Sequence, residues 1–170
     1  MKFFKLRNRL MLLFATSLLF LSGCQNNPEL DNYKANMNQF FENIKVFDSA
    51  INAIDPSSES AASDLLNILD SMETSFSQMA SLEVPDSFPG VEELADEASS
   101  YMTEAVSCYH QAFEGETYSA SMADVAKQNY DRANVRLQYI VSILHGEIPE
   151  EIYVYEEDTD TTEDDTVDFE

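Results

Sequence analysis

The stretch that decides the fold runs from Leu30 to Ile54, LDNYKANMNQFFENIKVFDSAINAI. Its apolar residues follow one another at alternating intervals of three and four, as Leu30, Tyr33, Met37, Phe40, Ile44, Phe47, Ile51 and Ile54. This spacing places them along one side of an α-helix and predicts an amphipathic helix with a heptad seam. Asparagine, frequent on the other faces, is a mediocre helix former, so we expect packing along the seam to stabilise the helix. Asp55-Pro56 ends it, because proline disfavours helical geometry in the preceding residue.

Three later stretches repeat this helical periodicity. The first has Ala62, Leu65, Leu69, Met72, Phe76 and Met79 on its stripe, with Leu66, Ile68 and Leu82 beside them. The second has Val91, Leu94, Ala98, Tyr101, Ala105, Cys108 and Ala112. The third has Met122, Ala126, Tyr130, Ala133, Leu137, Ile140 and Leu144, with Val125 and Ile143 beside them. Since only short breaks separate the four helices, we predict an all-α fold, an antiparallel up-down-up-down four-helix bundle over residues 30–146.

The first 24 residues have a different character. Four basic residues precede Leu10–Leu21, an apolar run of about 12 residues that is too short to cross a bilayer core. A positive start, a short apolar middle and a small-residue exit are typical of a secretory signal. The exit, Leu21-Ser22-Gly23-Cys24, resembles the lipobox of bacterial lipoproteins, with an aliphatic residue, two small residues and a cysteine.

The lipobox resemblance implies a lipid anchor. In that family the cysteine thiol receives a diacylglyceryl group, and a signal peptidase then cuts before it, here between Gly23 and Cys24. Residues 1–23 would be the signal peptide and residues 24–29 a lipidated tether. Two or more acyl chains suffice for stable anchoring, so the expected location is the extracytoplasmic face of a cell membrane. The chain also resembles small helical lipoproteins of bacteria in its architecture of lipobox, short tether, bundle and polar tail.

The other end of the chain, residues 147–170, is an acidic tail. It holds 12 acidic residues among 24 and no lysine or arginine. From Glu156 onward such a composition predicts disorder, because too little apolar surface is available for burial. The segment Ile152-Tyr153-Val154-Tyr155 differs, and it either packs on the bundle, or is disordered, or is a short recognition segment for a partner.

The charge balance restricts the partners. The whole chain has 32 acidic and nine basic residues, and removal of residues 1–23 leaves five basic ones, a net charge of −27. Nucleic acid is excluded, because its binding requires lysine and arginine at the phosphates. Anionic lipid headgroups also repel the chain, so the membrane contact depends on the anchor. Arg132 and Arg136, four residues apart, form the one basic spot, which either pairs with neighbouring acids or docks an acidic partner.

Residues for catalysis or metal binding are missing from the sequence. A di-iron bundle requires Glu-x-x-His pairs, but serines stand three residues before both His110 and His145. No nucleophile elbow or phosphate-binding glycine loop occurs. His110 is expected at the boundary of its helix stripe. Cys108 is expected in the core, with a reactive or intermolecular thiol as the alternative.

These observations predict a lipid-anchored, extracytoplasmic and non-enzymatic module without a cofactor. Its expected role is protein interaction or scaffolding, with another protein of the cell envelope as its partner. The alternative is a helical-bundle lipoprotein that binds a small ligand or a cation, either in a cavity between the helices or on the acidic tail.

Overall fold

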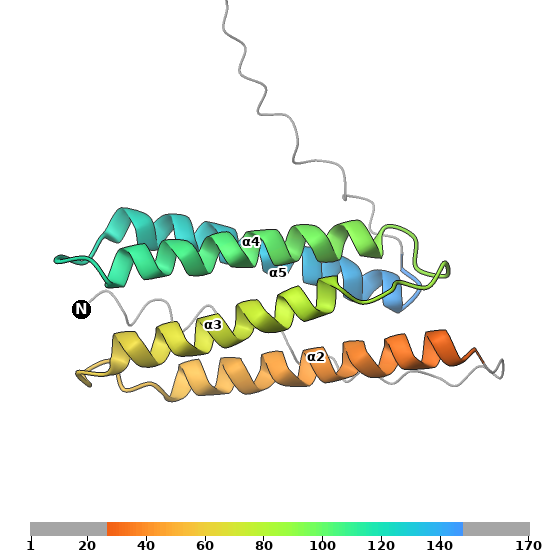
Figure 1. Cartoon of the computed structure of the whole chain (residues 1–170), viewed down its shortest axis with the longest axis horizontal. Helices are drawn as coiled ribbons and strands as arrows, with labels where there is room; N and C mark the ends of the chain where they lie inside the picture. The colour runs from red at the N-terminus through yellow and green to blue at the C-terminus, as the bar shows by residue number, and fades with distance from the viewer. Residues whose placement is uncertain (1–26, 148–170) are drawn as a thin grey trace, which may run out of the picture.

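The structure is a computed structural model that describes residues 27–147, and these residues form four helices without any strand (Figure 1). They are α2 (Pro28–Ala53), α3 (Ala61–Ala80), α4 (Val91–Phe113) and α5 (Ala120–Leu144). The predicted all-α class and the four helical stretches are confirmed for this part of the chain. The predicted signal peptide and the tail beyond Glu147 lie outside the described residues.

Local sequence signals explain where the helices begin and end. The Asn27 side chain accepts a hydrogen bond from the Leu30 amide at 3.4 Å, and Pro28 occupies the first helical position, so α2 begins two residues before the predicted seam. Ser119 caps α5 in the same way, through the Met122 amide at 3.4 Å. Gly146, with a φ of 82°, comes directly after His145, the residue that caps the end of α5, where a left-handed backbone favours glycine.

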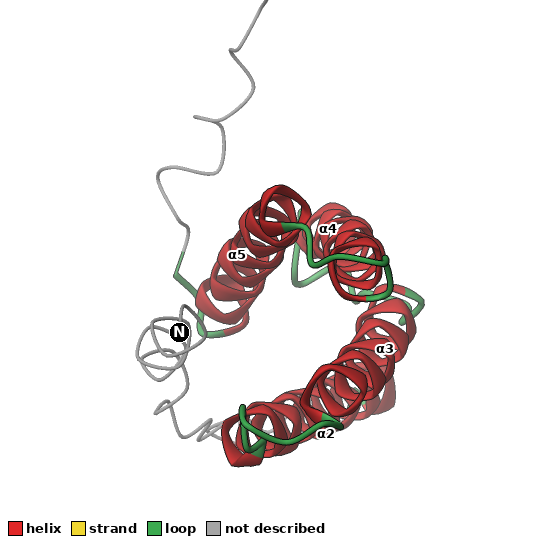
Figure 2. Ribbon diagram, turned by 90° about the vertical axis from the view of Figure 1, so that its left-hand side faces the viewer, coloured by secondary structure: helices red, strands yellow, loops and turns green. Residues whose placement is uncertain are grey.

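Helices that follow one another in the chain pack against one another. α2 contacts α3, α3 contacts α4, and the α4–α5 interface is the most extensive. Figure 2 shows the four helices around a common centre in chain order. The α2–α3 and α4–α5 connections lie at one end of the helices and the α3–α4 connection lies at the other (Figure 1). The described residues therefore form a helical bundle.

The predicted seams make the core. Every helix contributes fully buried large side chains, among them Phe41 and Met37 from α2, Phe76 from α3, Met102 from α4 and Leu137 from α5. The ring of Phe40 meets that of Phe76 edge-on, with 5.3 Å between the centroids. Burial of each large apolar side chain stabilises the fold by about 1.5–3 kcal/mol. On α4 and α5 the buried alanines allow the close approach expected from their place on the seam.

Some details of the predicted stripes are wrong. On α3 the buried residue is Leu66, while Leu65 packs against the core from its edge. On α5 Val125, predicted beside the stripe, is 41% exposed. In each case one of two adjacent apolar residues faces inward, because successive helical residues are 100° apart and a seam holds only one of them.

Cys108 lies in the core, as predicted. It is 2% exposed, and its Sγ lies 3.6 Å from Glu104 Oε1. Burial, together with the neighbouring Glu104 carboxylate, raises the pKa of the thiol, which disfavours the reactive thiolate. Within residues 27–147 no helix combines the length and the apolar character that a membrane span requires.

Candidate functional site

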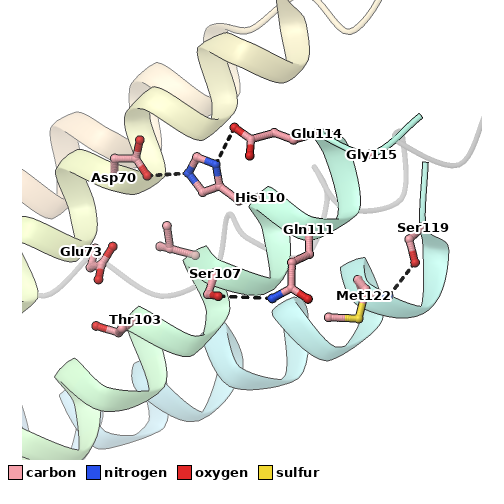
Figure 3. Close-up of a pocket in the computed structure, with 11 residues that line it drawn as sticks. Asp70, Glu73, Thr103, Ser107, His110, Gln111, Glu114, Gly115, Ser119 and Met122 are labelled. Atoms are coloured by element: carbon pink, nitrogen blue, oxygen red, sulfur yellow. Dashed lines mark hydrogen bonds and ion pairs between the residues drawn. The ribbon is translucent and has the colours of Figure 1, made fainter. Parts of the chain in front are cut away.

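An open pocket of about 800 Å³ lies where α3, α4 and the start of α5 meet (Figure 3). Its lining comprises Asp70, Glu73, Thr103, Val106, Ser107, His110, Gln111, Glu114, Gly115, Ser119 and Met122. We call this the acidic pocket, because three carboxylates from two helix segments border it. Small-molecule sites in proteins have volumes of roughly 300–1,000 Å³.

His110 joins two sides of the acidic pocket. Its Nε2 lies 2.7 Å from Asp70 Oδ1 on α3, and its Nδ1 lies 2.9 Å from Glu114 Oε1 at the end of α4. A neutral imidazole carries one N–H, so only the doubly protonated ring donates to both carboxylates. The hydrogen bonds to Asp70 and then Glu114 raise the pKa of His110 above 6.5. The side chain is 30% exposed, which agrees with the predicted boundary position.

The remaining polar groups determine what the acidic pocket can hold. Glu73 forms no hydrogen bond or ion pair with any other described residue. Gln111 Nε2 donates to Ser107 Oγ at 3.3 Å. Carboxylates bind cationic donors with short, charge-assisted hydrogen bonds, so the pocket suits an ammonium or a guanidinium group. Both His110 nitrogens face carboxylates, so in this arrangement the ring is not placed to activate a serine hydroxyl.

The described residues offer no metal centre. No three histidine, cysteine, aspartate or glutamate side chains between residues 27 and 147 come together in a way that could hold a metal ion. The acidic pocket includes one histidine and three carboxylates, but the ring nitrogens point at two of those carboxylates rather than at a shared centre.

The predicted basic spot lies on the α4–α5 interface, away from the acidic pocket. The guanidinium groups of Arg132 and Arg136 lie 5.7 and 5.3 Å from the centroid of the Tyr101 ring on α4. Arg136 Nε also donates to Glu97 Oε2 at 2.6 Å. Pairing with a neighbouring acid therefore holds for Arg136, while Arg132 is exposed and stacked on the ring.

Most other cationic side chains of the described part are also engaged by its own acids. Lys45 pairs with Glu42 at 2.6 Å, and Lys127 pairs with Asp131. Lys34 also takes part in a polar, ring or electrostatic interaction within the protein. The body therefore presents carboxylates to its surroundings far more than it presents cations.

Two further places carry polar groups. A pocket of about 400 Å³ lies between the start of α2 and the α3–α4 connection, and Asn27, Asn32, Asn36 and Tyr33 are among its lining residues. On α2, desolvation of the half-buried Asp48 raises its pKa to about 6. Burial, and after it the charge of Asp48, raises the pKa of Tyr130 on α5.

Several predicted site residues belong to the two ends of the chain, beyond the described residues. The cleavage pair Gly23 and Cys24, the latter also the expected lipid attachment point, lies outside the described residues. So does the segment Ile152–Tyr155, with Tyr153 and Val154 between its ends, which was a candidate partner contact.

The acidic pocket itself was missed in the sequence. Glu114 stands four residues after His110, a spacing that places the two on one helix face and is visible in the sequence. Asp70 stands 40 residues before His110, and no pattern in the sequence links them. The pairing depends on how α3 and α4 pack, which periodicity alone does not specify.

Comparisons with known proteins do not supply a function. No family model, no curated protein sequence and no solved structure matches the chain. The chemistry of its own residues is therefore the basis for a function.

Proposed function

We propose that the chain is a lipid-anchored, extracytoplasmic and non-enzymatic interaction module, which docks a basic segment of another cell-envelope protein. One observation carries this proposal: a body with 21 acidic and five basic residues between positions 27 and 147 has a pocket bordered by Asp70, Glu73 and Glu114. A lysine or arginine of the partner would enter that pocket and form charge-assisted hydrogen bonds with its carboxylates.

The anchor would determine how the acidic pocket is presented. In this proposal Cys24 carries the lipid, and the short tether keeps the start of α2, at Pro28, within about 14 Å of Cys24. The antiparallel, up-down-up-down order is part of the proposal. α2 has 26 residues and is therefore about 39 Å long, so the α4–α5 connection and Glu114 would stand far from the bilayer. A partner could then reach the pocket without contacting lipid.

The negative field of the body favours a basic partner over an acidic one. Excess carboxylates raise the rate at which a positively charged surface arrives, and salt screens this effect over about 8–10 Å. An acidic partner at Arg132 would have to approach through the same field, which opposes it. We therefore place the docking contact at the acidic pocket instead of the basic spot.

The same pocket supports a second candidate function, the binding of a small organic cation. Its volume of about 800 Å³ lies in the range of small-molecule sites, and its carboxylates suit an amine. A small ligand would raise the melting temperature of the protein at saturating concentration, because it binds the folded state. A protein partner would instead be recovered as a specific covalent adduct.

Crosslinking in intact native cells tests the proposal. The tagged full chain is compared with Cys24→Ala, which removes the anchor, and with Asp70→Asn/Glu73→Gln, which removes two pocket charges. Glu92→Gln/Glu93→Gln is the charge-matched control, because both residues lie in the first turn of α4, far along the helix from Glu114. We expect one envelope protein to be crosslinked by the wild type and by the control, and lost from the other two.

Two results would contradict the proposal. Equal capture by the anchored chain and by Cys24→Ala would remove the anchor from the interaction. Equal capture by Asp70→Asn/Glu73→Gln and by Glu92→Gln/Glu93→Gln would show that overall charge, and not the acidic pocket, attracts the partner.

A further inference from the structure

The acidic pocket already contains a side chain of the chain itself, His110, that becomes a cation when it is protonated. His110 reaches Asp70 and Glu114 at 2.7 and 2.9 Å, so its ring in the doubly protonated form occupies two of the three carboxylates (Figure 3). Any lysine or arginine that uses the same oxygen atoms must compete with this ring. The ring is also the one group of the pocket whose ordinary titration falls between pH 6 and 8.

The charged groups that face His110 come from two elements. α3 contributes Asp70 and Glu73, and the end of α4 contributes Glu114. The pocket residues of the α4–α5 connection and of α5, which are Gly115, Ser119 and Met122, carry no charge. Carboxylic acids in general titrate well below pH 6, so between pH 6 and 8 the charge of such a site changes through its histidine.

We propose that His110 is a proton-operated competitor for the acidic pocket: the imidazolium holds Asp70 and Glu114, and loss of its proton releases them to a cationic side chain of the partner. This inference rests on the proposed function, since it regulates the same pocket. At lower pH the pocket is closed by its own residue, and at higher pH it is open to a lysine or an arginine.

Two features of the contact support the switch. The hydrogen bonds to Asp70 and Glu114 favour the protonated ring and so raise the pKa of His110. The side chain remains 30% exposed, so the proton exchanges with solvent without unfolding. Because linkage is reciprocal, a cation that binds better to the deprotonated form must also lower the pKa of His110.

The test uses the full chain in a neutral detergent and a blocked tetralysine peptide as the probe. Lysine side chains stay charged at both pH 6 and pH 8.5, so the probe itself does not change. We expect the wild type to bind the peptide about fivefold more tightly at pH 8.5 than at pH 6, the low end of typical coupling. His110→Gln is expected to bind equally at both pH values, and more tightly than the wild type at pH 6.

The second histidine supplies the matched control. His145 follows the end of α5 and does not line the acidic pocket, so His145→Gln is expected to keep the pH dependence. The chain has two histidines, so each variant leaves a single imidazole signal in the proton NMR spectrum. Saturating peptide is expected to lower the pKa read from the His110 signal and to leave the chemical shift of the His145 signal unchanged.

The outcomes separate the two proposals. In one outcome the wild type binds the peptide equally at pH 6 and 8.5, and Asp70→Asn/Glu73→Gln binds it more weakly. That result would support docking at the acidic pocket and overturn the role of His110. If His110→Gln still binds the peptide more tightly at pH 8.5 than at pH 6, that result would also overturn the role of His110. No binding by the wild type or by His110→Gln at either pH would overturn docking at the pocket, and its regulation with it.

Discussion

Nε2 of His110 on α4 lies 2.7 Å from Oδ1 of Asp70 on α3, although 40 residues separate them in the sequence. This is a polar contact between two helices that both contribute apolar side chains to the core. It lies at the border of the acidic pocket, and its strength depends on whether the His110 imidazole is protonated. The contact therefore links the packing of α3 on α4, the pH and the availability of the pocket.

The His110 contact makes stability depend on pH. The folded-state pKa is raised, so the contribution is fully present below about pH 6.5 and is lost as the pH rises through the folded-state value. His110→Gln is expected to lower the free energy of unfolding by up to about 1 kcal/mol at pH 6, the range of exposed ion pairs, and to change it less at pH 9. Urea unfolding at the two pH values measures this. An equal loss of free energy of unfolding at pH 6 and at pH 9 would show that the substitution acts through packing and not through the charge of the ring.

Removal of the Asp48 carboxylate is expected to stabilise the protein, whereas removal of the His110 imidazole is expected to destabilise it. Its folded-state pKa is raised to about 6, so the folded state binds this proton more tightly than the unfolded chain does. The contribution of Asp48 to stability therefore falls as the pH rises from about 4 to 6. Asp48→Asn is expected to raise the midpoint of thermal unfolding at pH 7.5, where the wild type buries a charge. Exposed Asp64→Asn is the control, and a destabilised Asp48→Asn would show that the carboxylate has a stabilising partner.

The close approach of the helices predicts a steric effect at Ala105. This residue on α4 is 0% exposed, so a larger side chain has no room without displacement of the surrounding helices. Ala105→Leu is expected to lower the free energy of unfolding by about 1–3 kcal/mol through overpacking. Ser100→Leu, on an exposed position of the same helix, is the control and should change it little. Equal effects in chemical denaturation would contradict tight packing at α4.

Replacement of the Tyr101 ring at the α4–α5 interface is expected to destabilise the protein less than the change at Ala105. Its ring lies under the guanidinium groups of Arg132 and Arg136, and such contacts contribute about 0.5–1 kcal/mol at exposed sites. Tyr101→Leu keeps apolar area and removes the aromatic face, so a loss of this size is expected in the free energy of unfolding. In the Arg132→Gln/Arg136→Gln background the same substitution should cost less. An unchanged cost would mean that the ring matters only as apolar surface.

The sequence predicts the fold here because one kind of signal is strong. The 3-4 spacing from Tyr33 to Ile44 marks the buried side of α2, and alanines such as Ala98 and Ala133 mark where α4 and α5 approach closely. Choices between adjacent apolar residues, such as Leu65 and Leu66, depend on a rotation of the helix by one position, which neighbouring helices determine. Periodicity fixes a face only to within that rotation.

The acidic pocket is less predictable for a physical reason. Among 21 acidic residues of the described chain, nothing in the local sequence distinguishes Asp70 or Glu73 from carboxylates that only face solvent. Asp70 and Glu73 differ from those carboxylates because they line a pocket together with His110, which lies on the neighbouring helix α4. Arg132 and Arg136 show the reverse case, because a conspicuous sequence feature turns out to be engaged by Tyr101 and Glu97 of the same chain.

The central claim is that the acidic pocket, and not overall charge, docks a basic segment. The most direct measurement is the affinity of the blocked tetralysine peptide for the full chain at pH 8.5 in 0.15 M salt. Asp70→Asn/Glu73→Gln and Glu92→Gln/Glu93→Gln lose the same two charges at different places. We predict that the first variant loses at least fivefold in affinity while the second stays within twofold of the wild type. Equal losses in the two variants would contradict the claim.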